Sequence, residues 1–184
     1  TGIVIPYSCA AWIESIHRGI DVSRAAGEGV IAGCTGKTSE EKTQALLDLP
    51  DHAMIDMGDF AGGMLKYLRA HPVPKVVIGG GFAKISKLAE GNLDLHSGRS
   101  QVDFTWMADV AHELGASTEV AERIEGANTA AEALSIATEN GIALAPDIAR
   151  RASDVARYTL AGADIEIDVL VYDRGGNLVG RTDE

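Results

Sequence analysis

The sequence is poor in cysteine, aromatic residues, long apolar runs and positive charge, and each shortage excludes a class of protein. Of its 184 residues, 2 are cysteines and 5% are aromatic, while the formal net charge is −11. No apolar run reaches the roughly 20 residues that a membrane-spanning helix needs. An acidic chain also lacks the basic surface that nucleic acid and anionic membranes require. We therefore expect neither nucleic acid nor a membrane as a partner.

The two cysteines and the start of the chain indicate where the protein works and how it was made. Cys9 and Cys34 do not form a CxxC pair, so we expect free thiols in the reducing cytoplasm, not a disulfide or a zinc site. The chain opens on TGIVIPYS, without an initiator methionine or a signal segment. This start predicts a fragment, a processed product or a trimmed chain.

The first part of the sequence repeats a short apolar strand, a turn and a helix. Ser8 is the expected N-cap of a helix over residues 9–26, Thr38-x-x-Glu41 resembles a capping box, and Asp59 is placed to cap a later helix. The expected strands are residues 30–32, 53–57 and 76–78. Alternation of this kind predicts an α/β fold, with a parallel sheet, right-handed crossovers and helices on the faces of the sheet.

The last part of the sequence changes from helical to strand-like periodicity. A helical segment is expected over about residues 103–160, with helices at 103–114, 117–124, 128–139 and 146–160. Apolar and polar residues then alternate from Ile165 to Val171, and the turn-forming residues 173–177 follow. This pattern predicts a C-terminal β-hairpin over about residues 164–181. We expect residues 1–184 to form a single α/β unit.

Residues 75–103 carry the densest chemistry of the chain. We expect Gly79–Gly81 to form a turn between a strand and a helix, which is good geometry for holding an anion because free N–H groups point outward there. Lys84 and Lys87 lie three residues apart, so they are expected to share one exposed, basic helix face. A polar loop with Asn92, Asp94, His96, Ser97 and Arg99 follows.

Three other motifs have a functional and a structural interpretation. The segment GCTGKT resembles a nucleotide-binding P-loop, but Ile31 stands where that motif needs its first glycine. The MGDFAG segment, residues 57–62, fits a cofactor turn and an ordinary helix start equally well. His96 has no second histidine or cysteine at metal-ligand spacing, so we predict no protein-bound metal.

Taken together, these blocks resemble a known family. The segments TGIVIPYS, WIESIHRGIDVSRAAG, TGKTSEE, MGDFAG, GGGFAKISKLAEGNLDLHSGRSQVD and IEIDVLVYDRGGNLVGR occur in the order and spacing of CbiD-type cobalt-precorrin-5B C1-methyltransferases. The resemblance covers nearly the whole chain, which is similar to the C-terminal half of those proteins. It implies methyl transfer from S-adenosylmethionine to C1 of a corrinoid precursor in anaerobic cobalamin biosynthesis, with cobalt present only as part of the substrate.

Two features depart from the family pattern. Lys37 replaces an asparagine that the family usually carries, and Leu95 precedes His96-Ser97 where the family often has threonine. Family members also have a comparable region before the TGIV block, so an N-terminal half or partner chain is expected to complete the active site.

The resemblance supplies the reaction, and the residue roles are our hypotheses. The polycarboxylate substrate needs a local basic patch, and Asp59 or another loop acid is expected to hydrogen-bond the ribose or amino group of the cofactor. For cofactor binding we select Thr35, Gly36, Ser39, Gly58, Asp59 and Phe60. For substrate binding we select Lys84, Lys87, Asn92, Asp94, His96, Ser97 and Arg99. Two alternatives stay open: a nucleotide- or phosphate-binding α/β module, and a non-catalytic half that functions only with a partner chain.

Overall fold

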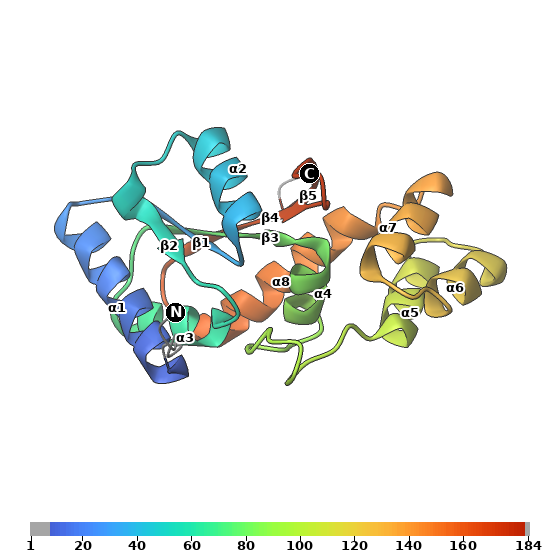
Figure 1. Cartoon of the computed structure of the whole chain (residues 1–184), viewed down its shortest axis with the longest axis horizontal. Coiled ribbons are helices and arrows are strands. Elements are labelled where there is room, and N and C mark those ends of the chain that lie inside the picture. Colours follow the sequence, from blue (N-terminus) through green and yellow to red (C-terminus); the bar gives the residue numbers. More distant parts are fainter. Residues whose placement is uncertain (1–7, 183–184) are drawn as a thin grey trace, which may run out of the picture.

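A five-stranded sheet forms the centre of the computed structural model, which describes residues 8–182 (Figure 1). Its strands are β1 (Val30–Cys34), β2 (Met54–Asp56), β3 (Lys75–Gly81), β4 (Glu166–Tyr172) and β5 (Leu178–Arg181). Their order across the sheet is β2-β1-β3-β4-β5; β1 to β4 are parallel, and β5 is antiparallel to β4. The predicted α/β class, parallel sheet and C-terminal hairpin are confirmed, while the opening segment TGIVIPY lies outside the described residues.

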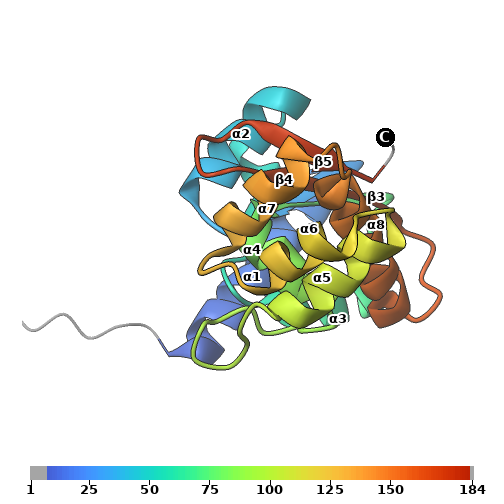
Figure 2. The ribbon, with the colours of Figure 1, turned by 90° about the vertical axis from the view of Figure 1, so that its right-hand side faces the viewer.

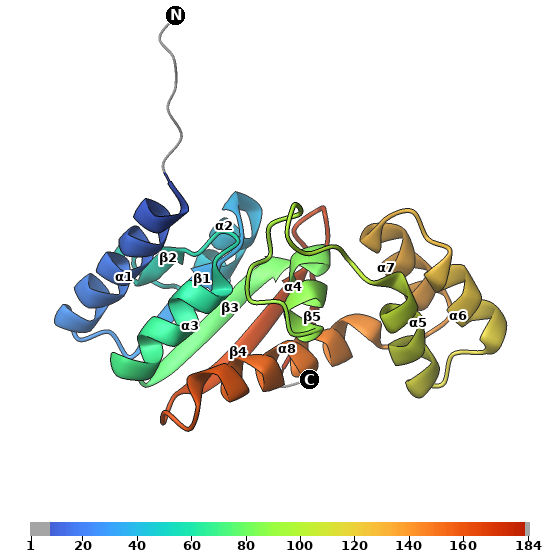
Figure 3. The ribbon, with the colours of Figure 1, turned by 90° about the horizontal axis from the view of Figure 1, so that it is seen from below.

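Helices cover both faces of the sheet. One face is covered by α1 (Cys9–Ala25), α3 (Ala61–Ala70), α4 (Phe82–Ala89) and α8 (Leu144–Leu160), which lie in front of the strands in Figure 3. The opposite face carries α2 (Lys37–Leu47), and the short 3-10 turn η1 (Asp51–Ala53) leads into β2. No helix within residues 8–182 has both the length and the apolar character needed to cross a membrane.

Most of the predicted helical segment forms a group at one side of the sheet, whereas its last helix, α8, packs on the sheet itself. Helices α5 (Phe104–Glu113), α6 (Thr118–Glu125) and α7 (Ala130–Glu139) pack on one another beyond α4, and Figure 2 views them face on. One cluster of buried apolar side chains runs from Ile16 and Val169 beneath the sheet to Met107 and Ile124 between these helices.

Small side chains allow α8 to pack closely on the sheet. Ala145, Ala149, Ala152 and Ala156 recur at helical spacing, and all four are buried. At Gly180 on β5, a Cβ atom would lie 2.5 Å from the carbonyl oxygen of Ala145. The alanine stripe and this glycine therefore set the distance between α8 and the C-terminal hairpin.

The expected glycine turn is wrong, because Gly79–Gly81 belong to β3. A Cβ atom at Gly79 would lie 2.5 Å from Thr43 Oγ1 on α2, and one at Gly80 would lie 2.7 Å from Ile85 Cδ1 on α4. The missing side chains thus let a helix approach each face of the strand. They provide close packing, not an anion-binding loop.

Only one of the three expected N-caps is present. Ser8 Oγ accepts a hydrogen bond from the Ala11 N–H at 3.1 Å, as predicted. The capping box at Thr38 is wrong, because α2 begins one residue earlier, after Gly36, without a side-chain cap. Asp59 is not a cap either, since α3 follows Phe60 and the Asp59 carboxylate binds Lys84 instead.

Candidate functional site

A cavity of about 490 Å³ lies at the carboxyl edge of the sheet, where β1 and β2 end. Ligand sites of open α/β folds commonly form at this edge, because successive turns and helix starts meet there. We call it the edge cavity. Its lining residues are Ser8, Cys9, Trp12, Thr35, Gly36, Lys37, Asp56, Gly58, Asp59, Phe60, Lys84 and His96.

The edge cavity brings together most of the residues selected for cofactor binding. Thr35 and Gly36 follow β1, while Gly58, Asp59 and Phe60 follow β2. The exception is Ser39, which is buried on α2 and donates a hydrogen bond to the Gly36 carbonyl at 2.7 Å. Ser39 therefore supports the turn from inside the fold and does not line the cavity.

Backbone hydrogen bonds fix the two turns. The Thr35 N–H donates to the Gly79 carbonyl at 2.9 Å, and the Gly58 N–H donates to the Cys34 carbonyl at 3.0 Å. Gly58 has a φ of +55°, and a Cβ atom there would lie 3.3 Å from the Trp12 ring. A side chain at this position would both strain the backbone and crowd the ring. The turns are thus held by the strands, with little freedom to move.

Trp12 covers the turn after β2, and it belongs to none of the motifs from which site residues were selected. Its indole N–H donates to the Asp56 carbonyl at 3.0 Å, and its ring centroid lies 6.4 Å from that of Phe60. The side chain remains 37% exposed. An exposed tryptophan beside a second aromatic ring gives the cavity an apolar wall, which a flat ring system can contact.

The two lysines of α4 lie in very different environments. Lys84 forms an ion pair with Asp59 and also donates to the Leu95 carbonyl at 3.3 Å. Lys87 is only 5% exposed, and its ammonium donates to the same carbonyl at 3.0 Å. Burial, followed by repulsion from Lys84, lowers the pKa of Lys87. The expectation of one exposed basic face is therefore wrong, because Lys87 points into the protein.

The polar loop that follows α4 is organised by Asp94. The Asp94 carboxylate accepts hydrogen bonds from the His96 N–H at 3.1 Å and from the Arg99 guanidinium at 2.8 Å. His96 lines the edge cavity, whereas Asn92 and Arg99 line a separate hollow near the start of α5. Ser97 is exposed. The structure thus does not gather the residues selected for substrate binding into one place.

Asp56 is the acidic residue of the cavity that sequence reasoning missed. It ends β2, twenty positions after Gly36, and no donor within residues 8–182 forms a hydrogen bond to its carboxylate. Desolvation by the surrounding protein raises the pKa of this carboxyl group. An acid at the end of the second strand, about 20 residues after the first turn, is where dinucleotide folds bind a ribose. That spacing was the signal available in the sequence.

Residues 94–183 match the family model described as the C-terminal domain of CbiD. Residues 94–183 belong to the CbiD family. The chain is 54% identical over 181 residues to a cobalt-precorrin-5B C(1)-methyltransferase of Brucella anthropi, and 55% identical over 181 residues to those of Brucella canis and Brucella suis. Each alignment covers 98% of this chain and 49% of the relative.

The CbiD resemblance predicted from the sequence is thereby confirmed. The chain spans about half the length of the curated relatives it matches. No solved structure matches it significantly. Among residues 8–182, no group of three or more histidine, cysteine, aspartate or glutamate side chains is arranged to hold a metal ion.

Proposed function

We propose that this chain is part of an enzyme that transfers the methyl group of S-adenosylmethionine to C1 of cobalt-precorrin-5B, in the anaerobic route to cobalamin. The relatives that cover 98% of the chain carry the name of this activity, and their identity to it is 54–55%. The observation that supports a donor site in this chain is the edge cavity at the carboxyl edge of a parallel sheet. There the Asp56 carboxylate, which has no hydrogen-bond donor among residues 8–182, lies beside an exposed aromatic wall.

The residues of the edge cavity fit a nucleoside with a positively charged sulfur. The carboxylate oxygens of Asp56 have no donor among the described residues, so they can accept hydrogen bonds from ribose hydroxyl groups. Trp12 and Phe60 offer aromatic surface to an adenine ring. Lys84 pairs with Asp59 and Lys37 pairs with Glu41, so Asp56 is the carboxylate of the cavity that favours a sulfonium cation. We therefore assign the edge cavity to the methyl donor.

The chain contributes positioning and electrostatics to the reaction. When bound, the donor supplies an electrophilic methyl group and leaves as a neutral thioether. Trp12 and the turns after β1 and β2 hold that donor in one orientation, because backbone hydrogen bonds fix them to the sheet. The pair of Lys84 and Asp59 closes the side of the cavity next to α4. Correct alignment of two reactants removes much of the entropic barrier to transfer.

We also propose a partner for this chain, because the relatives extend well beyond the part that it matches. We propose that residues 1–184 act as one unit, which the continuous buried cluster supports, and that an N-terminal half or partner chain completes the active site. The free thiols of Cys9 and Cys34 fit a reducing compartment, so we place the protein in the cytoplasm. The alternative of a phosphate-binding module loses its main support, because Gly79–Gly81 form a strand instead of a turn.

The test is transfer of a labelled methyl group from S-adenosylmethionine to cobalt-precorrin-5B by the intact protein and by its Asp56→Asn variant. We expect transfer by the wild type and a raised KM for the donor in the variant, because the amide binds ribose hydroxyls less strongly than the carboxylate. Transfer with an unchanged donor KM in Asp56→Asn would remove Asp56 from the donor site. Absence of any transfer by the wild type would overturn the proposed activity.

A further inference from the structure

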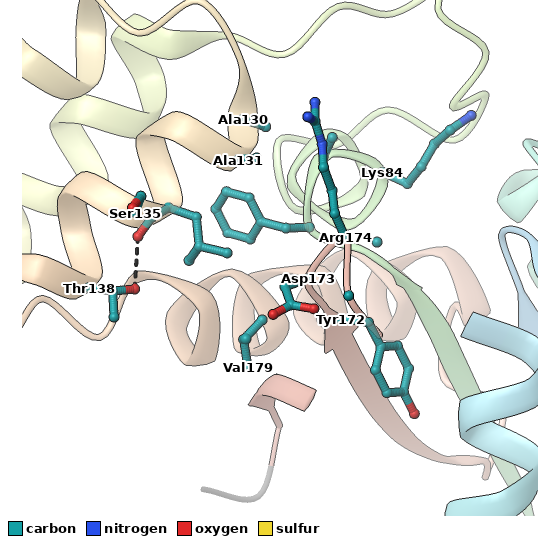
Figure 4. Close-up of a pocket in the computed structure, with 14 residues that line it drawn as sticks. Lys84, Ala130, Ala131, Ser135, Thr138, Tyr172, Asp173, Arg174 and Val179 are labelled. Atoms are coloured by element: carbon teal, nitrogen blue, oxygen red, sulfur yellow. Dashed lines mark hydrogen bonds between the residues drawn. The ribbon is translucent and has the colours of Figure 1, made fainter. Parts of the chain in front are cut away.

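A second cavity, of about 520 Å³, lies between α7, the start of α4 and the turn that joins β4 to β5 (Figure 4). Its wall is largely apolar and is formed by Phe82, Ala130, Ala131, Leu134 and Val179. These residues come from three elements that are far apart in the sequence. We call it the α7 cavity.

Two cations line the α7 cavity, Lys84 and Arg174, and Lys84 is already paired with Asp59. Arg174 lies on the β4–β5 turn, and Figure 4 shows its side chain rising from that turn on the side where Ala130 and Ala131 lie. It is exposed, and it forms no hydrogen bond or ion pair with the residues that the structure describes. In a chain of net charge −11, an unpaired arginine beside an apolar wall is an attractive site for an anion.

The turn that presents Arg174 is rigid. The Asp173 carboxylate accepts hydrogen bonds from the Asn177 N–H at 2.9 Å and from Asn177 Nδ2 at 2.8 Å. The turn also packs against α2, because a Cβ atom at Gly176 would lie 2.9 Å from Lys42 Cε. The backbone that carries Arg174 is therefore already ordered, so ligand binding has to order the side chain and not the turn.

The two cavities adjoin at Lys84, which lines both of them. Its ammonium reaches Asp59 in the edge cavity, and Figure 4 shows the side chain pointing away from Arg174. A molecule in the α7 cavity thus lies next to one in the edge cavity, separated by the first turn of α4.

We propose that the α7 cavity binds one edge of the corrinoid substrate, with the ring against the apolar wall and a peripheral carboxylate on Arg174. This inference rests on the proposed function, since a methyl acceptor must lie beside the methyl donor. A corrinoid precursor combines a broad apolar ring with carboxylates at its rim. This chemistry matches an apolar wall with two cations, of which Arg174 has no ion pair among the described residues. The cavity holds an edge of the macrocycle, and the remaining rings extend beyond it.

The experiment measures binding of two corrinoid probes to the intact protein by fluorescence quenching. Cobyrinic acid has free peripheral carboxylates, whereas cobinamide has amides in their place. We compare wild type with Arg174→Ala, Arg174→Lys and Arg123→Ala. Arg123 is the matched control, because it is also an exposed arginine but lies on α6, away from both cavities.

We expect Arg174→Ala to weaken cobyrinic acid binding about fivefold, the effect of one exposed charge contact, with Arg174→Lys between it and wild type. Arg123→Ala should bind like wild type, and cobinamide affinity should be the same in all four proteins. Ala131→Trp, which fills the cavity, should weaken both probes while leaving binding of S-adenosylhomocysteine, the demethylated donor, unchanged.

Equal cobyrinic acid affinity in Arg174→Ala and Arg123→Ala, together with unchanged binding in Ala131→Trp, would overturn the assignment of this cavity. That result would leave the proposed function intact as long as the wild type transfers a methyl group. Failure of the α7 cavity assignment can therefore be distinguished from failure of the proposed function. Donor binding and methyl transfer are measured separately from corrinoid affinity.

Discussion

Replacing Lys87 by glutamate should destabilise the protein strongly, although replacing a helix lysine ordinarily changes stability little. The Lys87 ammonium is buried and donates to the Leu95 carbonyl at 3.0 Å. A carboxylate at this position would be buried against a carbonyl oxygen, and the nearby Lys84 ammonium is already paired with Asp59. Leaving a buried charge uncompensated costs about 3–5 kcal/mol.

A second variant separates the effect of charge from the effect of packing. Lys87→Met keeps most of the side-chain volume but loses a hydrogen bond worth about 1.5–3 kcal/mol, and it no longer buries a charge. The net cost should be about 1 kcal/mol, because these two effects oppose each other. Lys66→Glu on α3 is the control, since Lys66 is exposed and its replacement should leave stability close to that of wild type.

Urea unfolding followed by circular dichroism measures all three variants. For a slope of about 2 kcal/mol per molar urea, Lys87→Glu should lower the midpoint by roughly 1.5–2.5 M. If Lys87→Glu unfolds at the same urea concentration as Lys66→Glu, Lys87 is not buried against the loop. That result would contradict the packing of α4 against residues 93–95.

Two further predictions concern the sheet and the donor site. Gly79→Ala should cost about 1–3 kcal/mol of stability, because its Cβ atom would lie 2.5 Å from Thr43 Oγ1, whereas Gly81→Ala has open space and should be tolerated; equal urea midpoints for the two variants would refute this. Affinity for S-adenosylhomocysteine, measured by calorimetry, should fall as the pH is lowered through the pKa of Asp56. Burial raises that pKa above 3.8, and the ionised carboxylate is the form that accepts ribose hydroxyls. Asp56→Asn should lose this dependence; if Glu40→Gln loses it instead, the neighbouring Glu40, whose pKa burial also raises, is the group responsible.

The arrangement of the early strands could be predicted from the sequence because the signals are local. Each apolar run is followed by a turn and a helix, and the handedness of such units then fixes parallel strands with their turns at one edge. Most of the residues selected for the cofactor lie together for that reason, since they follow β1 and β2. The insertion of β4 beside β3 is different, because it pairs Lys75 with Glu166 across the whole helical segment. Periodicity carries no information about such distant partners.

The missed features depend on tertiary contacts. Three consecutive glycines suggest a turn until α2 and α4 are seen to press on β3 from both sides. Lys87 is classed as exposed by its charge, yet the loop that folds back over α4 buries it. Arg174 lies in a segment typical of turns, so the sequence does not single it out. Its position at a cavity follows from the packing of α7, which lies more than thirty residues earlier in the chain.

The most direct test of the donor site is calorimetric titration of the intact protein with S-adenosylhomocysteine, comparing wild type, Asp56→Ala and Asp164→Ala. Asp164 is an exposed aspartate just before β4, at the opposite edge of the sheet, so its removal changes net charge by the same amount. We predict binding by wild type and Asp164→Ala with equal affinity, and at least fivefold weaker binding by Asp56→Ala, as expected for the loss of charge-assisted hydrogen bonds. Equal affinity in all three proteins would contradict the assignment of the methyl donor to the edge cavity.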